Sequence, residues 1–258
     1  MSLRTLLVLL VALAGSPPAL AASGGVAMQS AHTNVGNTAA LQRGARLYMN
    51  YCASCHSMQF LRYSRMAEDL GLTEEQVMTN LNLSGAKFGE TIRAGMPRAN
   101  AEAWFGTAPP DLSLTARSRG VDWIFNYLKS FYADPDRAAG WNNTILPGAA
   151  MPHVLWELQG SQVPVTHPPE TGKDGKPEAC KGPTIGAACF VAFETASPGA
   201  LSPAEYDEVV RDITTFMQYA AEPAALQREK YGVWVILFLA VLTFLLWMLK
   251  HEYWRDVH

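Results

Sequence analysis

The sequence predicts a mainly α-helical domain that carries a long loop insertion and is followed by one C-terminal transmembrane helix. Three observations predict this: apolar residues are concentrated at the two ends of the chain, helical spacing dominates between them, and no stretch shows sustained alternation. The 258 residues are 49% hydrophobic and 17% charged, which is too polar for a polytopic membrane protein. With a net charge of −3, the chain lacks the basic excess that nucleic-acid binding requires.

The first 21 residues have the three parts of an export signal. Arg4 provides a positive start, residues 6–13 form a short apolar run, and residues 19–21 read Ala-Leu-Ala, a small-x-small cleavage pattern. The apolar run is shorter than the about 20 residues that cross a bilayer. We therefore expect a signal peptide over residues 1–21 and an exported domain over residues 22–225.

Helical patterns recur through the exported domain. Apolar residues at steps of three and four predict a helix over residues 38–51: Leu41, Ala45, Tyr48 and Cys52. Gly44 on the same face allows a second helix to approach closely. Capping boxes begin further helices after Thr73 and Ser202, and we expect another over residues 121–132.

Residues 160–199 are rich in proline and glycine and predict a long surface insertion. Strands are expected to amount to a minor hairpin at most. Cys180 and Cys189 lie in this insertion. Because an exported domain is in an oxidising compartment, we expect the two cysteines to form a disulfide that steadies the insertion.

A membrane anchor is predicted near the C-terminus. Residues 231–249 contain no charged side chain, and at about 1.5 Å per residue a helix of that length spans roughly 28 Å, close to the bilayer core. Tyr231, Trp234 and Trp247 lie near its ends, where aromatic rings favour the membrane interface. We expect an anchor over residues 226–250 and a cytoplasmic tail over residues 251–258.

The residues Cys52-Ala53-Ser54-Cys55-His56 form a Cys-x-x-Cys-His motif at the end of a predicted helix, the attachment pattern of haem c. The two thiols reach the two vinyl groups at one haem edge, and the imidazole that follows becomes the proximal iron ligand. A thioredoxin-type redox pair would need a βαβ context, and a zinc site would need a second ligand pair. Neither is found in the sequence, so one haem is expected.

The sixth iron ligand is less clear from the pattern alone. Met96 and Met151 both lie in predicted loops and both precede a proline, which favours an extended backbone at the methionine. His153 is a third candidate, although a histidine near a haem is more often a hydrogen-bonding neighbour. The small residues before Met151 favour it, and the alternatives stay open at this point.

Three further segments, in order, resemble a known family. Arg43-Gly44 precedes the haem motif, Ala-Pro-Pro-Asp-Leu-Ser follows it at residues 108–113, and Ala-Ala-Glu-Pro stands before the anchor at residues 220–223. Together with the motif they resemble the cytochrome c1 family, the membrane-anchored haem subunits of the ubiquinol–cytochrome c oxidoreductase (bc1) complex. The resemblance covers essentially the whole chain after the signal.

The resemblance implies a cytochrome c-like fold and one covalent haem c, attached through Cys52 and Cys55. It implies His56 and Met151 as the iron ligands and leaves Met96 as an ordinary loop residue. Other implied haem contacts are an apolar wall of Pro109 and Pro110 and an arginine on a propionate. Arg119 is the favoured arginine, although Arg117 also fits.

The resemblance also implies a function. The chain would not be an enzyme on its own but would carry one electron from the Rieske iron–sulfur protein to cytochrome c, docked beside cytochrome b in a dimeric complex. The implied location is the bacterial inner membrane, with the haem domain on the periplasmic side. Four acidic residues follow soon after the motif: Glu68, Asp69, Glu74 and Glu75. They could attract a basic cytochrome c by their negative charge, and a solvated helix face explains them equally well.

Two other functions remain open from the sequence. One is an anchored c-type cytochrome that belongs to a different assembly. The other is a thiol–disulfide exchange protein that uses Cys52 and Cys55 as a redox pair.

Overall fold

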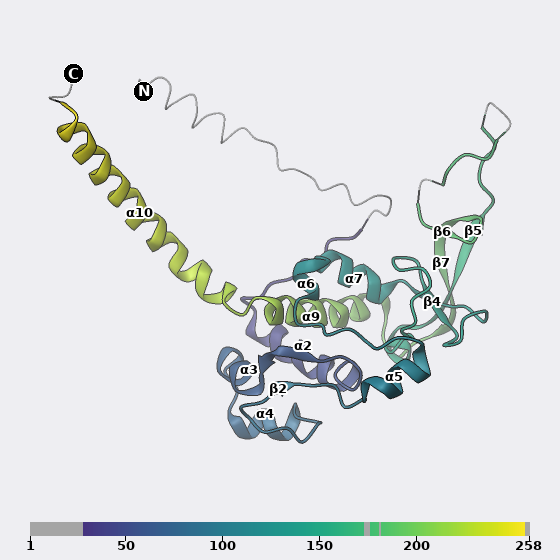
Figure 1. Cartoon of the computed structure of the whole chain (residues 1–258). Helices are drawn as coiled ribbons and strands as arrows, with labels where there is room; N and C mark the ends of the chain where they lie inside the picture. Colours follow the sequence, from purple (N-terminus) through teal and green to yellow (C-terminus); the bar gives the residue numbers. More distant parts are fainter. Residues whose placement is uncertain (1–27, 173–175, 181, 256–258) are drawn as a thin grey trace.

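The helices form the body of the protein, and one long helix and a β-sheet extend from it at different ends (Figure 1). The computed structural model describes residues 28–172, 176–180 and 182–255. The predicted signal peptide, residues 1–21, lies outside the described residues. Helices account for most of the regular structure in the described part of the chain.

The centre of the body is a pair of packed helices, α2 (Thr38–Tyr51) and α9 (Pro203–Ala221). The bounds of α2 are those expected from the sequence, and the side chain of Asn37 caps its first turn by accepting from the Ala40 N–H. The apolar face of α2 is buried in the main core. Gly44 makes the close approach possible, because a methyl group there would overlap the Asp212 carbonyl and lie 2.8 Å from Phe216 Cβ.

An ion pair between the exposed Arg43 and the largely buried Asp212 joins the same two helices. Arg43 Nε donates to one carboxylate oxygen of Asp212 at 2.6 Å, and its Nη2 donates to the other at 3.0 Å. The hydrogen bond to Asp212 raises the pKa of Arg43. This two-point contact restricts the rotation of α2 against α9, since two nitrogens of the planar guanidinium donate to the two oxygens of one carboxylate.

Six shorter helices complete the body: α3 (Tyr63–Leu70), α4 (Glu74–Asn80), α5 (Arg98–Phe105), α6 (Thr115–Ser118), α7 (Val121–Lys129) and α8 (Trp156–Gln159). Both predicted capping boxes are confirmed, at Thr73 before α4 and at Ser202 before α9. The expected end of the helix over residues 121–132 is wrong. Helix α7 ends at Lys129, and the next residues form β3 (Phe131–Ala133), which pairs antiparallel with β4 (Trp141–Asn143).

The prediction of at most one minor hairpin is also wrong. Strands β1 (Met58–Arg62) and β2 (Thr91–Ile92) pair beside the haem motif. The expected loop insertion instead contains a three-stranded antiparallel sheet in the order β5-β7-β6: β5 (Gly160–His167), β6 (Thr184–Ile185) and β7 (Ala188–Pro198). Only one residue of β5 and one of β7 are buried, which explains the missing apolar alternation. Pro164 is tolerated because β5 is an edge strand.

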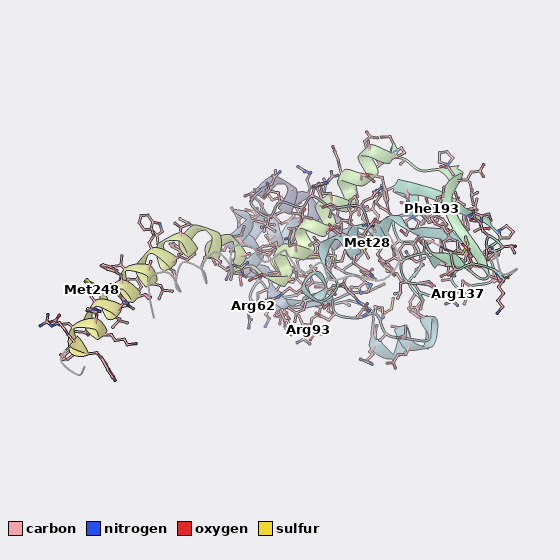
Figure 2. The ribbon with its side chains drawn as sticks, turned by 90° about the horizontal axis from the view of Figure 1, so that it is seen from above. Met28, Arg62, Arg93, Arg137, Phe193 and Met248 are labelled. Atoms are coloured by element: carbon pink, nitrogen blue, oxygen red, sulfur yellow. A yellow bond between two sulfur atoms is a disulfide. The ribbon has the colours of Figure 1, made fainter. Side chains whose placement is uncertain are left out.

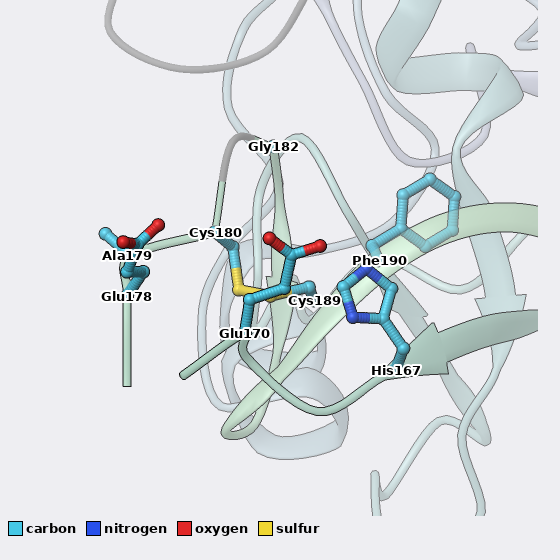
Figure 3. Close-up of a pocket in the computed structure, with 8 residues that line it drawn as sticks. All are labelled: His167, Glu170, Glu178, Ala179, Cys180, Gly182, Cys189 and Phe190. Atoms are coloured by element: carbon cyan, nitrogen blue, oxygen red, sulfur yellow. A yellow bond between two sulfur atoms is a disulfide. The ribbon is translucent and has the colours of Figure 1, made fainter. Parts of the chain in front are cut away.

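A disulfide joins Cys180 to Cys189 near the far end of this sheet, with the two Cα atoms 5.4 Å apart. Figure 3 shows the bond beside a small pocket that His167, Glu170 and Phe190 also line. The bond ties the loop before β6 to the start of β7. It therefore stabilises the sheet locally and lies away from the main core.

Helix α10 (Ala225–Tyr253) extends from the body and exposes its apolar side chains. Figure 2 labels Met248 on this helix, at the opposite end of the molecule from Phe193 in β7. Among the described residues, Lys230–Tyr253 is the one segment long and apolar enough to cross a membrane, with a mean hydropathy of 2.6. It packs no apolar face against the body, unlike the core helix of a soluble protein.

We predict that Gly44→Ala lowers the free energy of unfolding by roughly 2 to 3 kcal/mol, because overpacking forces α2 away from α9. Thermal unfolding of the detergent-purified chain measures the loss. Gly89→Ala is the matched control, since nothing lies within 4 Å of a methyl group at that position. Equal melting temperatures for the two variants would contradict the assigned contact.

Candidate functional site

The Cys-x-x-Cys-His motif forms a tight turn at the end of α2. The Cys52 carbonyl accepts from the Cys55 N–H at 3.1 Å and from the His56 N–H at 2.8 Å. The buried Tyr48 hydroxyl donates to the His56 carbonyl at 2.9 Å and holds the end of the turn. Cys52 and Cys55 are not bonded to each other, so both thiols are available for another bond.

The imidazole of His56 is buried and oriented by one hydrogen bond. Its Nδ1 lies 2.8 Å from the Pro110 carbonyl oxygen. Because a carbonyl can only accept, Nδ1 carries the proton, and Nε2 keeps a free lone pair. Burial lowers the pKa of His56, which favours the neutral ring. This is the arrangement that metal-ligating histidines commonly use.

The segment that contains Pro109 and Pro110 is tied to the chain just after the motif. Asp111 accepts from the Gln59 N–H at 2.9 Å, and the Leu112 N–H donates to the Ser57 carbonyl at 2.8 Å. An apolar wall was the expected role of Pro110, and the contact of its carbonyl with His56 was not expected. No side-chain pattern could have found this contact, because every residue has the same carbonyl.

Met151 lies half-buried in the loop between β4 and α8, and its sulfur accepts from the Tyr127 hydroxyl at 3.5 Å. The loop is shaped by Asn143, whose side chain is fully buried. Asn143 Oδ1 accepts from the Ile145 and Leu146 N–H groups, and Nδ2 donates to the Tyr127 carbonyl. Neither Tyr127 nor Asn143 was expected in the site, and the only sequence signal for them is an Asn shortly before Met151.

The other two ligand candidates have different surroundings. The His153 ring stacks on Phe131 at 5.2 Å between centroids and meets the edge of Trp141 at 5.1 Å. Burial lowers the pKa of His153 to about 4, so the ring is neutral. Met96 lies beside the motif, where its N–H donates to the Ser54 carbonyl at 3.1 Å.

Arg119 is connected to Met151 through two aromatic rings. Its guanidinium lies 5.2 Å from the Trp123 ring centre, and Trp123 stacks on Tyr127 at 4.9 Å. The structure thus places one group of site residues around His56 and Pro110 and a second around Tyr127 and Met151.

The acidic group after the motif is largely engaged in local contacts. Asp69 accepts from Arg65 at 2.6 Å and from the Tyr219 hydroxyl at 2.8 Å. Glu74 and Glu75 lie in the first turn of α4, where acidic residues stabilise a helix. These contacts favour a structural role for Asp69 in particular.

The donor set fits a covalently bound haem c. It consists of two thiols not bonded to each other, an imidazole whose Nε2 has a free lone pair, and a thioether (Cys52, Cys55, His56 and Met151). Burial raises the pKa of the Cys52 thiol to about 12, whereas the attacking cysteine of a thiol–disulfide exchange protein has a lowered pKa. The donor chemistry therefore favours haem attachment over thiol exchange.

Comparison with known proteins agrees with this donor set. The model of the Cytochrome C1 family matches residues 30–164 and 199–257. The chain belongs to the cytochrome c1 family. As a member, it is a haem protein of electron transport with one covalently bound haem c. The match leaves out residues 165–198, which include the last residues of β5, all of β6 and β7, and the Cys180–Cys189 disulfide.

Relatives with assigned names align over most of the chain. A cytochrome c1 of Allochromatium vinosum is 47% identical over 94% of this chain and 95% of its own length. The ammonia monooxygenase gamma subunit of Nitrosomonas europaea is 40% identical over 84% of this chain and 83% of its own length. A cytochrome c1 of Rhodospirillum rubrum is 28% identical over 84% of this chain and 81% of its own length.

We predict that Asn143→Ala lowers the free energy of unfolding of the protein by about 2 to 3 kcal/mol, because three backbone groups lose a buried hydrogen-bond partner. The melting temperature of the detergent-purified protein measures the loss. Asn50→Ala is the control, since Asn50 is exposed on α2 and donates only to the Arg46 carbonyl. A melting temperature as high for Asn143→Ala as for the control would show that the loop does not depend on this amide.

Proposed function

We propose that the chain is the electron-transfer subunit of the respiratory bc1 complex, accepting one electron from the Rieske iron–sulfur protein and passing it to cytochrome c. Membership of the cytochrome c1 family implies electron transfer in that complex. The observation that carries the proposal is the buried His56, with Nδ1 bonded to Pro110 and Nε2 free. A bound haem c supplies an iron that alternates between two oxidation states.

The protein's own residues hold and shield that iron. His56, kept in one orientation by the Pro110 carbonyl, would hold the iron from one side of the site. Met151 would supply the second protein ligand, and a site with two such ligands would favour electron transfer over the binding of small molecules. Pro109 and Pro110 would exclude water from the haem, and Arg119 would pair with a propionate by a charge-assisted hydrogen bond.

The anchor determines where this chemistry takes place. Residues 226–250 cross the bacterial inner membrane once and dock beside cytochrome b, within a dimeric complex. After removal of residues 1–21, the haem domain of residues 22–225 lies in the periplasm, and residues 251–258 lie in the cytoplasm. The apolar span Lys230–Tyr253 of α10, which is not buried against the body, supports this arrangement, as do the bacterial relatives.

A second candidate function is that of an anchored c-type cytochrome in a different assembly. The Nitrosomonas europaea relative, at 40% identity over most of its length, is named as a subunit of ammonia monooxygenase. The same haem domain and anchor are compatible with either assembly, because the haem site does not itself specify a neighbour.

Isolation of the native assembly distinguishes the two candidates. We expect the detergent-purified complex to contain cytochrome b and a Rieske protein, and to oxidise ubiquinol with cytochrome c as the acceptor. A pyridine haemochrome spectrum of the isolated chain should show one haem c per polypeptide. A complex without cytochrome b would favour the second candidate, and a chain without haem would favour thiol exchange.

We predict that Met151→Leu keeps the haem attached but strongly lowers its reduction potential, since leucine offers no sulfur to the iron. A redox titration followed by absorbance measures the change. Met96→Leu is the matched control, because Met96 is the other methionine that precedes a proline in this domain. A lowered potential in Met96→Leu alone would reassign the sixth ligand.

A further inference from the structure

The hydrogen bond between Tyr127 and Met151 connects the core of the domain to the proposed iron ligand. The Tyr127 hydroxyl is the donor, and its oxygen lies 3.5 Å from Met151 Sδ, within the normal range for a sulfur acceptor. A thioether sulfur has two lone pairs. One can therefore face a metal while the other accepts a hydrogen bond, although sulfur is a weak acceptor.

The ring of Tyr127 is held by two neighbouring aromatic rings, and its backbone is fixed as well. Trp123 stacks on the ring at 4.9 Å with an interplanar angle of 9°, and Phe131 packs against it at 5.0 Å with an angle of 69°. The buried Asn143 amide donates to the Tyr127 carbonyl at 2.8 Å. Because these contacts do not involve the hydroxyl, the hydroxyl is positioned for Met151 without being needed to hold the ring.

We propose that Tyr127 is a positioning residue that directs the Met151 thioether and draws electron density from its sulfur, which makes the haem easier to reduce. The inference rests on the proposed ligation by Met151. A hydrogen bond to the sulfur lowers the σ-electron density that the sulfur can donate, and σ donation stabilises ferric iron more than ferrous iron. The hydrogen bond therefore destabilises the oxidised state more than the reduced state. Loss of the whole thioether has the opposite effect, because it removes the soft ligand that favours ferrous iron.

Tyr127→Phe tests the inference, because it removes the hydroxyl and keeps the stacked ring. We expect the haem to stay attached and the absorption band typical of methionine-ligated ferric haem to remain. At a fixed ambient potential, the ratio of reduced to oxidised protein should fall about two- to tenfold, the range expected for loss of one neutral hydrogen bond. A redox titration of the full chain in detergent measures this ratio without any turnover.

Tyr206→Phe is the matched control. The Tyr206 hydroxyl is buried and donates at 2.9 Å to the carbonyl of Leu128, the residue next to Tyr127. Loss of the Tyr206 hydroxyl perturbs α7 but leaves the hydrogen bond to the Met151 sulfur intact. The ratio of reduced to oxidised protein should therefore not change. If the ratio fell equally in Tyr206→Phe, the effect would come from the packing of α7, and the inference would be overturned.

Two further variants make the outcome decisive. A fluorinated tyrosine at position 127 keeps the ring and strengthens the donor, and it should shift the ratio in the opposite direction. Met151→Leu, titrated in parallel, tests the ligation by itself. If Met151→Leu lowers the potential and Tyr127→Phe leaves it unchanged, the inference fails and the proposed function stands; if Met151→Leu has no effect, the ligation fails and the inference fails with it.

Discussion

The packing of two helices against α9 is the constraint on which the rest of the structure depends. Helix α2 approaches α9 at Gly44 and ends at the haem motif, and helix α7 packs against α9 and carries Tyr127. The two groups of site residues are therefore positioned against one common helix, although seventy residues separate His56 from Tyr127 in the sequence. A cofactor whose ligands come from distant segments requires that both segments pack against the same helix.

The parts of this arrangement that the sequence predicts are those with local causes. The span of α2 follows from its apolar spacing and both capping boxes from neighbouring residues, while the role of Gly44 follows from its place on the packed face. The haem motif is equally local, because covalent attachment requires its residues at fixed spacing. Such features can be predicted from the sequence before the fold is known.

The features that the sequence does not predict depend on contacts between distant segments. The Pro110 carbonyl that orients His56 is a backbone atom, and the Asn143 amide becomes important only because its loop closes on Tyr127. Strands β5 and β7 were not predicted because each buries only one residue, so their pairing leaves no apolar alternation in the sequence. The early end of α7 has a related cause, since Phe131 is buried through strand pairing with Asn143.

The junction between α9 and α10 limits how the haem domain can move. Only Glu222, Pro223 and Ala224 separate the two helices, and Glu222 forms an ion pair with Arg228 on the first turns of α10. Three residues reach at most about 11 Å when fully extended. A domain joined to its membrane helix by so short a linker cannot move between distant sites. Long-range transport of the electron therefore depends on a partner that diffuses freely.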